Sequence, residues 1–182
     1  MLVAVNFIAF QLGWFACVLG AAHGLAWAGT GLALAVVAWH LGRASAPRAE
    51  LMLILTAAGI GALWDSALAA VGWIRYPSGV LIEGAAPHWI VALWMLFATT
   101  LNLSLGWLKR SMPLAAVFGA MGGPLAYLGG AGLGALEMVE QHQALAALAL
   151  GWAAFTPLLL QVARLYDGYR VPKGPGTEAS HA

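Results

Sequence analysis

Six long apolar stretches follow one another along this chain of 182 residues. A helix needs about 20 mostly apolar residues to cross the roughly 30 Å of hydrocarbon in a bilayer. Inside hydrocarbon the backbone must form its own hydrogen bonds, so stretches of this kind are predicted to be helices. They cover residues 2–22, 25–41, 50–74, 89–108, 113–136 and 144–165. The sequence therefore predicts an all-α fold, a polytopic transmembrane bundle of six spans.

The scarcity of charge excludes other classes of protein. Only 8% of the residues are charged and 62% are hydrophobic, whereas an ordinary soluble domain has about 25% charged residues. So few charges cannot cover the surface of a water-soluble globule, and a disordered chain requires low hydrophobicity. The formal net charge of +1 provides no basic field for nucleic acid, so no nucleic-acid partner is expected.

The end of the chain differs in composition from the predicted bundle. Residues 167–182 are polar and rich in Pro and Gly, and chain termini are commonly poorly ordered unless they are tied down. We expect a six-helix membrane domain over residues 1–166 and a disordered cytoplasmic tail over residues 167–182. The stretch 25–41 is the shortest, and a five-span alternative would make it re-entrant.

Basic residues gather on one side of the predicted membrane. With six spans, one side holds seven of them and the other side holds only Arg75. The seven are Arg43, Arg48, Lys109, Arg110, Arg164, Arg170 and Lys173. Because loops rich in Lys and Arg stay in the cytoplasm, both termini are predicted to be cytoplasmic. The expected location is the bacterial inner membrane, as a multi-pass protein.

Asp65 is the acidic residue that lies deep inside a predicted span. An ionisable side chain in hydrocarbon costs about 3 kcal/mol on insertion scales, so its presence needs a reason. Gly61 and Ala69 lie four residues to either side and place the acid on a face of small residues, where a neighbour packs closely. Asp65 is therefore either a protonatable or ligand-binding carboxylate, a candidate catalytic group, or a neutral acid that hydrogen-bonds between helices.

The fourth predicted span carries the densest group of polar residues: Thr99, Thr100, Asn102 and Ser104. If the stretch is helical, Thr99 and Asn102 share one face, and Thr100 and Ser104 share the adjacent face. A carboxamide has two N–H groups and an oxygen to satisfy, so Asn102 needs partners. The group predicts either hydrogen bonds between helices or part of a polar site that holds a headgroup or substrate.

The first and fifth spans add further candidates. Gln11 and Trp14 lie three residues apart and share one helical face, which indicates either interhelical hydrogen bonding or a ligand contact. In the fifth span, glycines recur on one face that also carries Tyr127, and small residues allow close helix packing. Pro124 removes one helical hydrogen bond, so a kink is expected there, as a packing feature or as a hinge beside a site.

Metal and cofactor sites are not predicted. The single cysteine excludes a zinc site built on several thiolates. The histidines are isolated and form no histidine box, which argues against a di-iron desaturase. The glycine-rich run over residues 130–134 follows no predicted strand, so it is not interpreted as a nucleotide loop.

Several of these features together resemble a known family. They are residues 10–18 (FQLGWFACV), Asp65, residues 94–104 (WMLFATTLNLS) and residues 122–127 (GGPLAY). The combination resembles a family of small six-helix proteobacterial inner-membrane proteins known only as a domain of unknown function. Members are often encoded beside cyclopropane-fatty-acyl-phospholipid-synthase-like and flavin amine-oxidase-like proteins, in operons linked to photooxidative or envelope stress. The resemblance implies a role near membrane-lipid modification and carries over no catalytic residues.

Three functions remain open from the sequence. The first is a lipid-binding or accessory protein that works with membrane lipids and lipid-modifying enzymes. The second is a membrane-embedded enzyme on a lipid or isoprenoid, with Asp65 as acid or base. Asp65 and Asn102 differ in depth by about 10 Å at 1.5 Å per residue, so Tyr127 is the better-placed partner. The third is a small transporter, for which six short helices would have to form a homo-oligomer.

Overall fold

The computed structural model describes residues 1–170, in which six α-helices provide almost all of the regular structure. The helices are α1 (Leu2–Ala22), α2 (Ala26–Arg43), α3 (Pro47–Ala70), α4 (His88–Ala98), α5 (Met112–Gly132) and α6 (Gln141–Leu165). A short 3₁₀ helix, η1 (Gly106–Arg110), and two short strands, β1 (Ile74–Arg75) and β2 (Glu137–Met138), complete the set. The chain is therefore all-helical apart from one small ribbon.

Four of the helices, α1, α3, α5 and α6, are long and apolar enough to cross a membrane. Their outward side chains are largely hydrophobic, as in a surface that faces lipid rather than water. The helix α2 is shorter and carries His40 and Arg43 in its last turn, and α4 has only 11 residues. The four long apolar helices indicate a membrane protein. The count of six spans remains a prediction.

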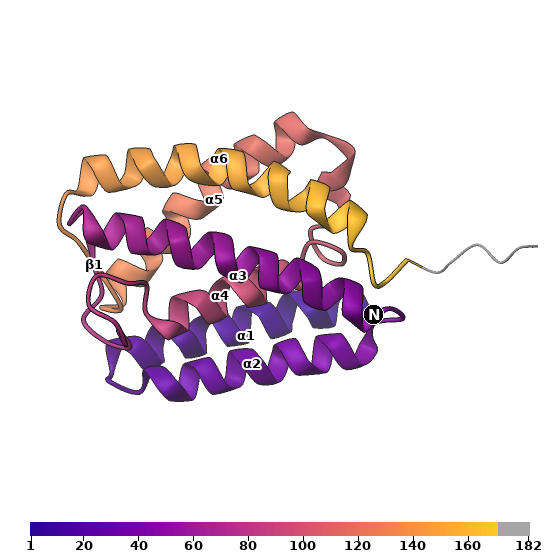
Figure 1. Cartoon of the computed structure of the whole chain (residues 1–182), viewed down its shortest axis with the longest axis horizontal. Coiled ribbons are helices and arrows are strands. Elements are labelled where there is room, and N and C mark those ends of the chain that lie inside the picture. The colour runs from indigo at the N-terminus through magenta and orange to yellow at the C-terminus, as the bar shows by residue number, and fades with distance from the viewer. Residues whose placement is uncertain (171–182) are drawn as a thin grey trace, which may run out of the picture.

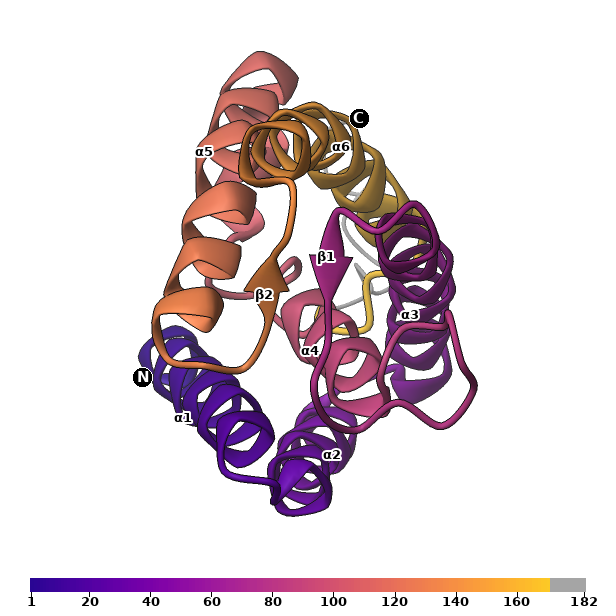
Figure 2. The same cartoon turned by 90° about the vertical axis from the view of Figure 1, so that its left-hand side faces the viewer.

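The helices lie side by side in a bundle in which α4 occupies the interior (Figure 1). Seen from one end, the other five helices surround α4 (Figure 2). The helices α1 and α2 form one packed hairpin, α5 and α6 form another, and α4 packs against α1, α2 and α3. The bundle thus consists of two helical hairpins joined through α3 and α4.

The predicted span over residues 89–108 is not one helix. After α4, residues 99–105 form turns and η1 follows. The hydroxyl groups of Thr99 and Thr100 donate to backbone carbonyls three residues earlier, at 2.7 and 2.6 Å. Local bonds of this kind compete with the helical pattern. The prediction of one continuous helix was wrong, and Thr99 and Asn102 lie in turns after the end of α4.

The glycine faces of the bundle make room for tryptophan rings. A methyl group placed on Gly61 of α3 would lie 2.1 Å from the ring of Trp94. A methyl group on Gly123 of α5 would lie 2.3 Å from the ring of Trp152. Neither position tolerates a side chain without movement of an indole, so these small residues seat aromatic side chains as well as neighbouring helices.

The strands β1 and β2 connect two distant loops at one end of the bundle (Figure 2). They pair antiparallel, with Ile74 opposite Met138 and Arg75 opposite Glu137. The side chains of Arg75 and Glu137 form an exposed ion pair at 3.0 Å. The ribbon ties the segment after α3 to the segment before α6, so it fastens the α5–α6 hairpin to the rest of the bundle.

The chain continues in packed structure beyond α6, at the end of the bundle where α1 begins (Figure 1). The backbone N–H of Gly168 donates to Glu50 Oε1 at 2.9 Å, and the Tyr169 hydroxyl donates to the His40 carbonyl at 2.6 Å. The structured part of the chain therefore passes the expected boundary at residue 166. Residues 171–182 of the predicted tail lie outside the described residues.

Candidate functional site

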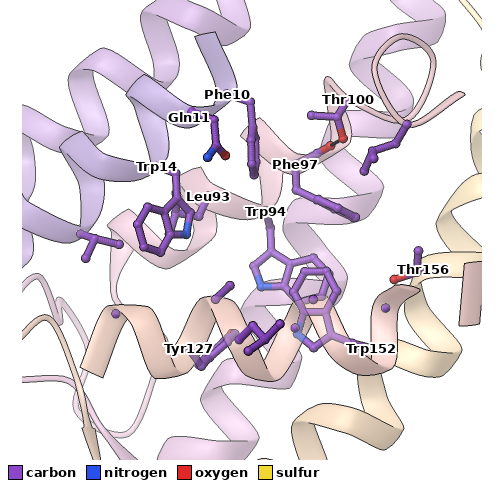
Figure 3. A pocket seen from close by; sticks show the side chains of 18 of the residues that line it. Phe10, Gln11, Trp14, Leu93, Trp94, Phe97, Thr100, Tyr127, Trp152 and Thr156 are labelled. Atoms are coloured by element: carbon purple, nitrogen blue, oxygen red, sulfur yellow. Dashed lines mark hydrogen bonds between the residues drawn. The ribbon is translucent and has the colours of Figure 1, made fainter. Parts of the chain in front are cut away.

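A cavity of about 450 Å³ lies between α1, α4, α5 and α6. We call it the α1–α5 cavity, because these two helices form its opposite walls. Nine aromatic side chains line it: Phe7, Phe10, Trp14, Trp89, Trp94, Phe97, Phe118, Tyr127 and Trp152. Its volume is within the range of about 300–1,000 Å³ that is usual for small-molecule sites. Figure 3 shows several of these side chains converging on the open space.

The α1–α5 cavity is long and runs along the helices. Its lining extends from Phe7 to Val18 on α1 and from Phe118 to Gly130 on α5. At 1.5 Å per residue these segments are about 17–18 Å long. That length exceeds half of the roughly 30 Å hydrocarbon thickness. An extended chain that crosses about one leaflet would fit along it.

The cavity opens sideways between its two walls. Within residues 1–170, α1 packs extensively on α2 and α4, and α5 packs on α6, but α1 and α5 share no extensive contact. The lining residues Phe7, Phe118 and Leu125 are exposed on the outer surface. These exposed side chains place the opening of the cavity at the outer surface, between α1 and α5.

No charged side chain lines the cavity among the described residues. Its polar groups are few, and some are already occupied. The Ser104 hydroxyl donates to Asn6 Oδ1 at 2.7 Å, and the Thr100 hydroxyl donates to the Phe97 carbonyl. The carboxamide of Gln11 points into the space between α1 and α4 (Figure 3). Such a surface suits an uncharged, mainly apolar molecule, because a charge would lose its water without finding a partner.

Asp65 lies behind the cavity wall. Its side chain is fully buried and accepts hydrogen bonds from Tyr76 and Tyr127 at Oδ1, at 2.7 and 2.5 Å. The indole N–H of Trp94 donates to Oδ2 at 2.8 Å. Tyr127 and Trp94 also line the cavity, so the acid holds two wall residues in place. Tyr76 follows β1, and burial, then the negative charge of Asp65, raises its pKa well above 10.0.

A second polar cluster surrounds Glu50 at the first turn of α3. His40 Nε2 lies 2.8 Å from Glu50 Oε2, and both side chains are fully buried. Asn102 Nδ2 donates to Glu50 Oε1 at 2.5 Å. Lys109 donates to the Asn102 oxygen and pairs with Asp167 at 3.1 Å. This Glu50 cluster binds together α2, α3, the turn before η1 and the chain after α6.

The predicted candidates therefore fall into two places. Five of them line the α1–α5 cavity: Gln11, Trp14, Thr100, Ser104 and Tyr127. Asp65 contacts Tyr127, as the predicted depths favoured, but it does not reach the cavity surface. Asn102 belongs to the Glu50 cluster, where it contacts Glu50 and Lys109. The structure brings Asp65 and Tyr127 together and keeps Asn102 apart from them.

Sequence reasoning missed two groups of residues. Glu50 and His40 were assigned to the ends of predicted spans, yet they form a buried pair. An acid and a histidine close in sequence at adjoining span ends are a signal that could have indicated this pairing. Phe10 and Trp152 line the cavity, but an aromatic residue in an apolar span carries no signal that distinguishes a cavity wall from a lipid-facing surface.

Metal ligation has no visible basis in residues 1–170, where no three His, Cys, Asp or Glu side chains are grouped closely enough to hold an ion. The acids Asp65 and Glu50 are instead surrounded by hydrogen-bond donors of the protein.

Comparison with known proteins identifies a family. A sequence profile for the family described as "Protein of unknown function (DUF2878)" matches residues 3–158. No curated protein and no solved structure matches the chain. The match covers every helix of the bundle, with α6 included up to residue 158.

Proposed function

The chain belongs to the DUF2878 family of proteins of unknown function, and from this premise we propose that it is a lipid-binding membrane protein. The α1–α5 cavity receives one uncharged lipid chain sideways from the bilayer. The main observation in support is a cavity of about 450 Å³ that opens between two apolar helices and has no charged side chain in its lining among the described residues.

The packing of the walls supports this proposal. In a membrane, burial from lipid supplies no hydrophobic driving force, so helices associate through close packing and hydrogen bonds. The helices α1 and α5 make no extensive contact along the cavity, where Trp14 approaches Gly129, and they leave aromatic side chains facing the space between them. A bound chain restores the missing van der Waals contacts along both walls.

The position of Asp65 favours binding over catalysis. A general acid or base must come within hydrogen-bond reach of the substrate. Asp65 is fully buried, and both of its oxygens accept bonds from Tyr76, Trp94 and Tyr127. Two of these donors stand between the carboxyl group and the cavity. We therefore assign Asp65 a positioning role for the cavity wall rather than a catalytic role.

The proposed topology is six crossings with both termini in the cytoplasm, in the bacterial inner membrane. The beginning of α1 and the end of α6 lie at the same end of the bundle, as an even number of crossings requires (Figure 1). The segment from α4 to η1 supplies the fourth crossing, although residues 99–105 are not helical. Non-helical backbone is tolerated at membrane depth when protein surrounds it, and Thr99 and Leu101 are fully buried.

Partners follow from this function as a further part of the proposal. A protein that holds a lipid chain inside the bilayer can present it to enzymes that modify membrane lipids. Such enzymes would approach the side on which α1 and α5 part, because the bound chain is accessible there. A second copy of the chain could cover the same opening, and chemical crosslinking in membranes distinguishes the two arrangements.

A cavity-filling substitution tests the proposal. Gly122 lines the cavity, and a methyl group there would meet only the ring of Phe118, at 4.0 Å. Gly122→Leu should fill the space without a clash, and leucine is the better helix former by about 1 kcal/mol. The matched control is Gly59→Leu on α3, outside the cavity lining, where a methyl group meets nothing within 4 Å.

The measurement is photocrosslinking in vesicles of phosphatidylethanolamine and phosphatidylglycerol. The probe is a methyl stearate that carries a diazirine in its chain. We expect crosslinks on the cavity residues of α1 and α5, at least five-fold fewer with Gly122→Leu and unchanged with Gly59→Leu. Crosslinks spread evenly over the outer helix faces, and equal in both variants, would overturn the proposal.

A further inference from the structure

Two polar atoms in the cavity wall lack hydrogen-bond partners within the described chain. They are the indole nitrogen of Trp152 and the hydroxyl oxygen of Thr156, both buried. The two residues lie four apart on α6 and so share one helical face. A buried polar group without a partner costs about 1–3 kcal/mol, so such groups are rare and need an explanation.

Both residues line the α1–α5 cavity, and protein packs against their other sides. The ring of Trp94 stacks on Trp152 with centroids 4.5 Å apart, and Gly123 packs against the same indole. Gly119 of α5 covers Thr156 so closely that a methyl group there would lie 2.3 Å from the hydroxyl oxygen. The side that remains open to both residues is the cavity that they line (Figure 3).

The depth of these atoms restricts the occupant. Trp152 lies eleven residues from the start of α6 and thirteen from its end. At 1.5 Å per residue it is about 16–20 Å from either end, near the middle of the bilayer. The polar groups of an ordinary phospholipid lie outside the roughly 30 Å hydrocarbon core. A phospholipid in its usual position therefore cannot bring an oxygen to Trp152.

We propose that the occupant is a lipid with an uncharged carbonyl oxygen within its hydrocarbon part, and that this oxygen binds between Trp152 and Thr156. The inference rests on the proposed function of the α1–α5 cavity. An indole N–H can only donate, so it requires an acceptor, and the threonine hydroxyl can donate as well. A carbonyl oxygen accepts both bonds with its two lone pairs and brings no donor that would itself need a partner.

The uncharged lining of the cavity also excludes charged ligands. A carboxylate or phosphate would lie in the cavity without a cation, since no charged side chain lines it in the described structure. Isoprenoid quinones and acyl chains with a ketone in mid-chain share the required chemistry: a long apolar chain and an uncharged carbonyl. A segment of either lipid can lie along a slot of about 17–18 Å, as given by the helical rise of its walls.

The test compares two esters that differ only in a ketone at mid-chain. Methyl stearate and a methyl stearate with a mid-chain ketone form the pair, and decylubiquinone represents the quinones. Binding to the full chain in detergent micelles is measured by native mass spectrometry. We expect the keto ester to bind about ten-fold more tightly than methyl stearate, which corresponds to about 1.4 kcal/mol.

Substitutions of the two residues test whether they bind the ketone oxygen. Trp152→Phe and Thr156→Val should each reduce the preference for the keto ester about three-fold or more and leave methyl stearate binding unchanged. The matched control is Trp64→Phe. The N–H of Trp64 is also buried and unpartnered in the described chain, but Trp64 packs on Gly151 and does not line the cavity. This control should keep the full preference.

The outcomes separate the two proposals. If the keto ester and methyl stearate bind equally in the wild type, the carbonyl site is overturned while lipid binding stands. If neither binds, both proposals fail. Loss of decylubiquinone binding in Trp152→Phe identifies a quinone as the source, and loss for the keto ester alone identifies an oxidised acyl chain.

A stability measurement excludes a merely structural role. Thr156→Val removes a hydroxyl that has no partner in the described chain and keeps the volume of the side chain, so the melting temperature of the ligand-free protein should stay the same or rise. A structural role predicts a fall instead. If Trp152→Phe fails to fold, Thr156→Val alone carries the comparison, because it removes only the hydroxyl group and keeps a branched side chain.

Discussion

Two buried acids on α3 are stabilised in different ways. Asp65 lies in the interior of the bundle and accepts hydrogen bonds from three uncharged donors, Tyr76, Trp94 and Tyr127. Glu50 lies at the first turn of the helix beside a histidine, an amide and a backbone N–H, with the Lys109–Asp167 ion pair next to them. The two carboxyl groups are equally inaccessible, since each side chain is fully buried.

The partners of the two acids differ in kind. Around Asp65, five residues before the end of α3, the protein uses aromatic donors that are themselves mainly apolar. Glu50, three residues after the start of α3, takes part in a network that includes Lys109. Aromatic donors thus fix a wall of the α1–α5 cavity, and the ionic network fixes the end of the bundle.

The largest loss of stability is expected when Glu50 is removed from its cluster. Glu50→Ala leaves His40, Asn102 and the Gly168 N–H without their shared acceptor. Breaking a buried pair in this way costs about 3–5 kcal/mol. The free energy of unfolding, measured by titration with SDS in mixed micelles, should fall by this amount.

A matched substitution at an exposed pair sharpens that result. Glu137→Ala removes the partner of Arg75, and both side chains of this pair are more than half exposed. Exposed pairs contribute about 0–1 kcal/mol, so the variant should resemble the wild type. Equal losses in the two variants would mean that burial does not distinguish these acids.

The second-largest loss of stability is expected when the aromatic donors lose Asp65 as their acceptor. Asp65→Ala should lower the free energy of unfolding by about 2–3 kcal/mol, since the two tyrosine hydroxyls can pair with each other and Trp94 keeps an unpaired N–H. Asp65→Asn should lose about half as much, because its amide oxygen still accepts from the tyrosines. The same SDS titration measures both changes. If Asp65→Asn is as harmful as Asp65→Ala, neutral donors are not what stabilises this acid.

A smaller effect is expected at the edge of the Glu50 cluster. The Tyr169 hydroxyl donates to the His40 carbonyl at 2.6 Å. Tyr169→Phe removes that bond and keeps the ring, so the loss should be about 1 kcal/mol. Thermal unfolding in detergent, with Tyr166→Phe as the control, measures it. A loss as large as that of Glu50→Ala would show that the chain end, and not the acid, stabilises this end of the bundle.

The smallest effect is a dependence on pH. Burial, then the negative charge of Glu50, raises the pKa of Tyr169 to about 12 from 10.0, although Arg43 opposes the shift. The folded protein favours the neutral phenol, so this contribution to stability is complete below pH 10. It declines as the pH rises from about 10 to about 12. Ultraviolet titration of phenolate should show a step near pH 12 that Tyr169→Phe lacks; its persistence would contradict the assignment.

The sequence predicted the long helices well. Apolar length alone placed the first span over the residues of α1 and predicted α2 and α6 to within three residues at each end. The small residues around Asp65 predicted a closely packed neighbour, and Trp94 fills that place at Gly61. These predictions succeeded because they rest on local composition and on the helical period.

The remaining features depend on contacts between distant segments. The buried state of Glu50 requires Asn102, 52 residues away, and Gly168, 118 residues away. The helix α4 ends where the hydroxyls of Thr99 and Thr100 donate to backbone carbonyls, and a hydropathy profile carries no information about such bonds. The cavity exists because α1 and α5 make no extensive contact, and the sequence contains no signal for packing that is absent.

The order of synthesis gives these distant contacts a consequence in time. Tyr127 follows Asp65 by 62 residues, and Gly168 follows Glu50 by 118 residues. At about 5–20 residues per second, these donors emerge from the ribosome roughly 3–12 and 6–24 seconds after the acids they serve. Until then each acid lacks a partner that holds it in the finished bundle. A chain that stops before α5 therefore exposes incompletely paired carboxyl groups, a mark by which membrane quality control can recognise an unfinished product.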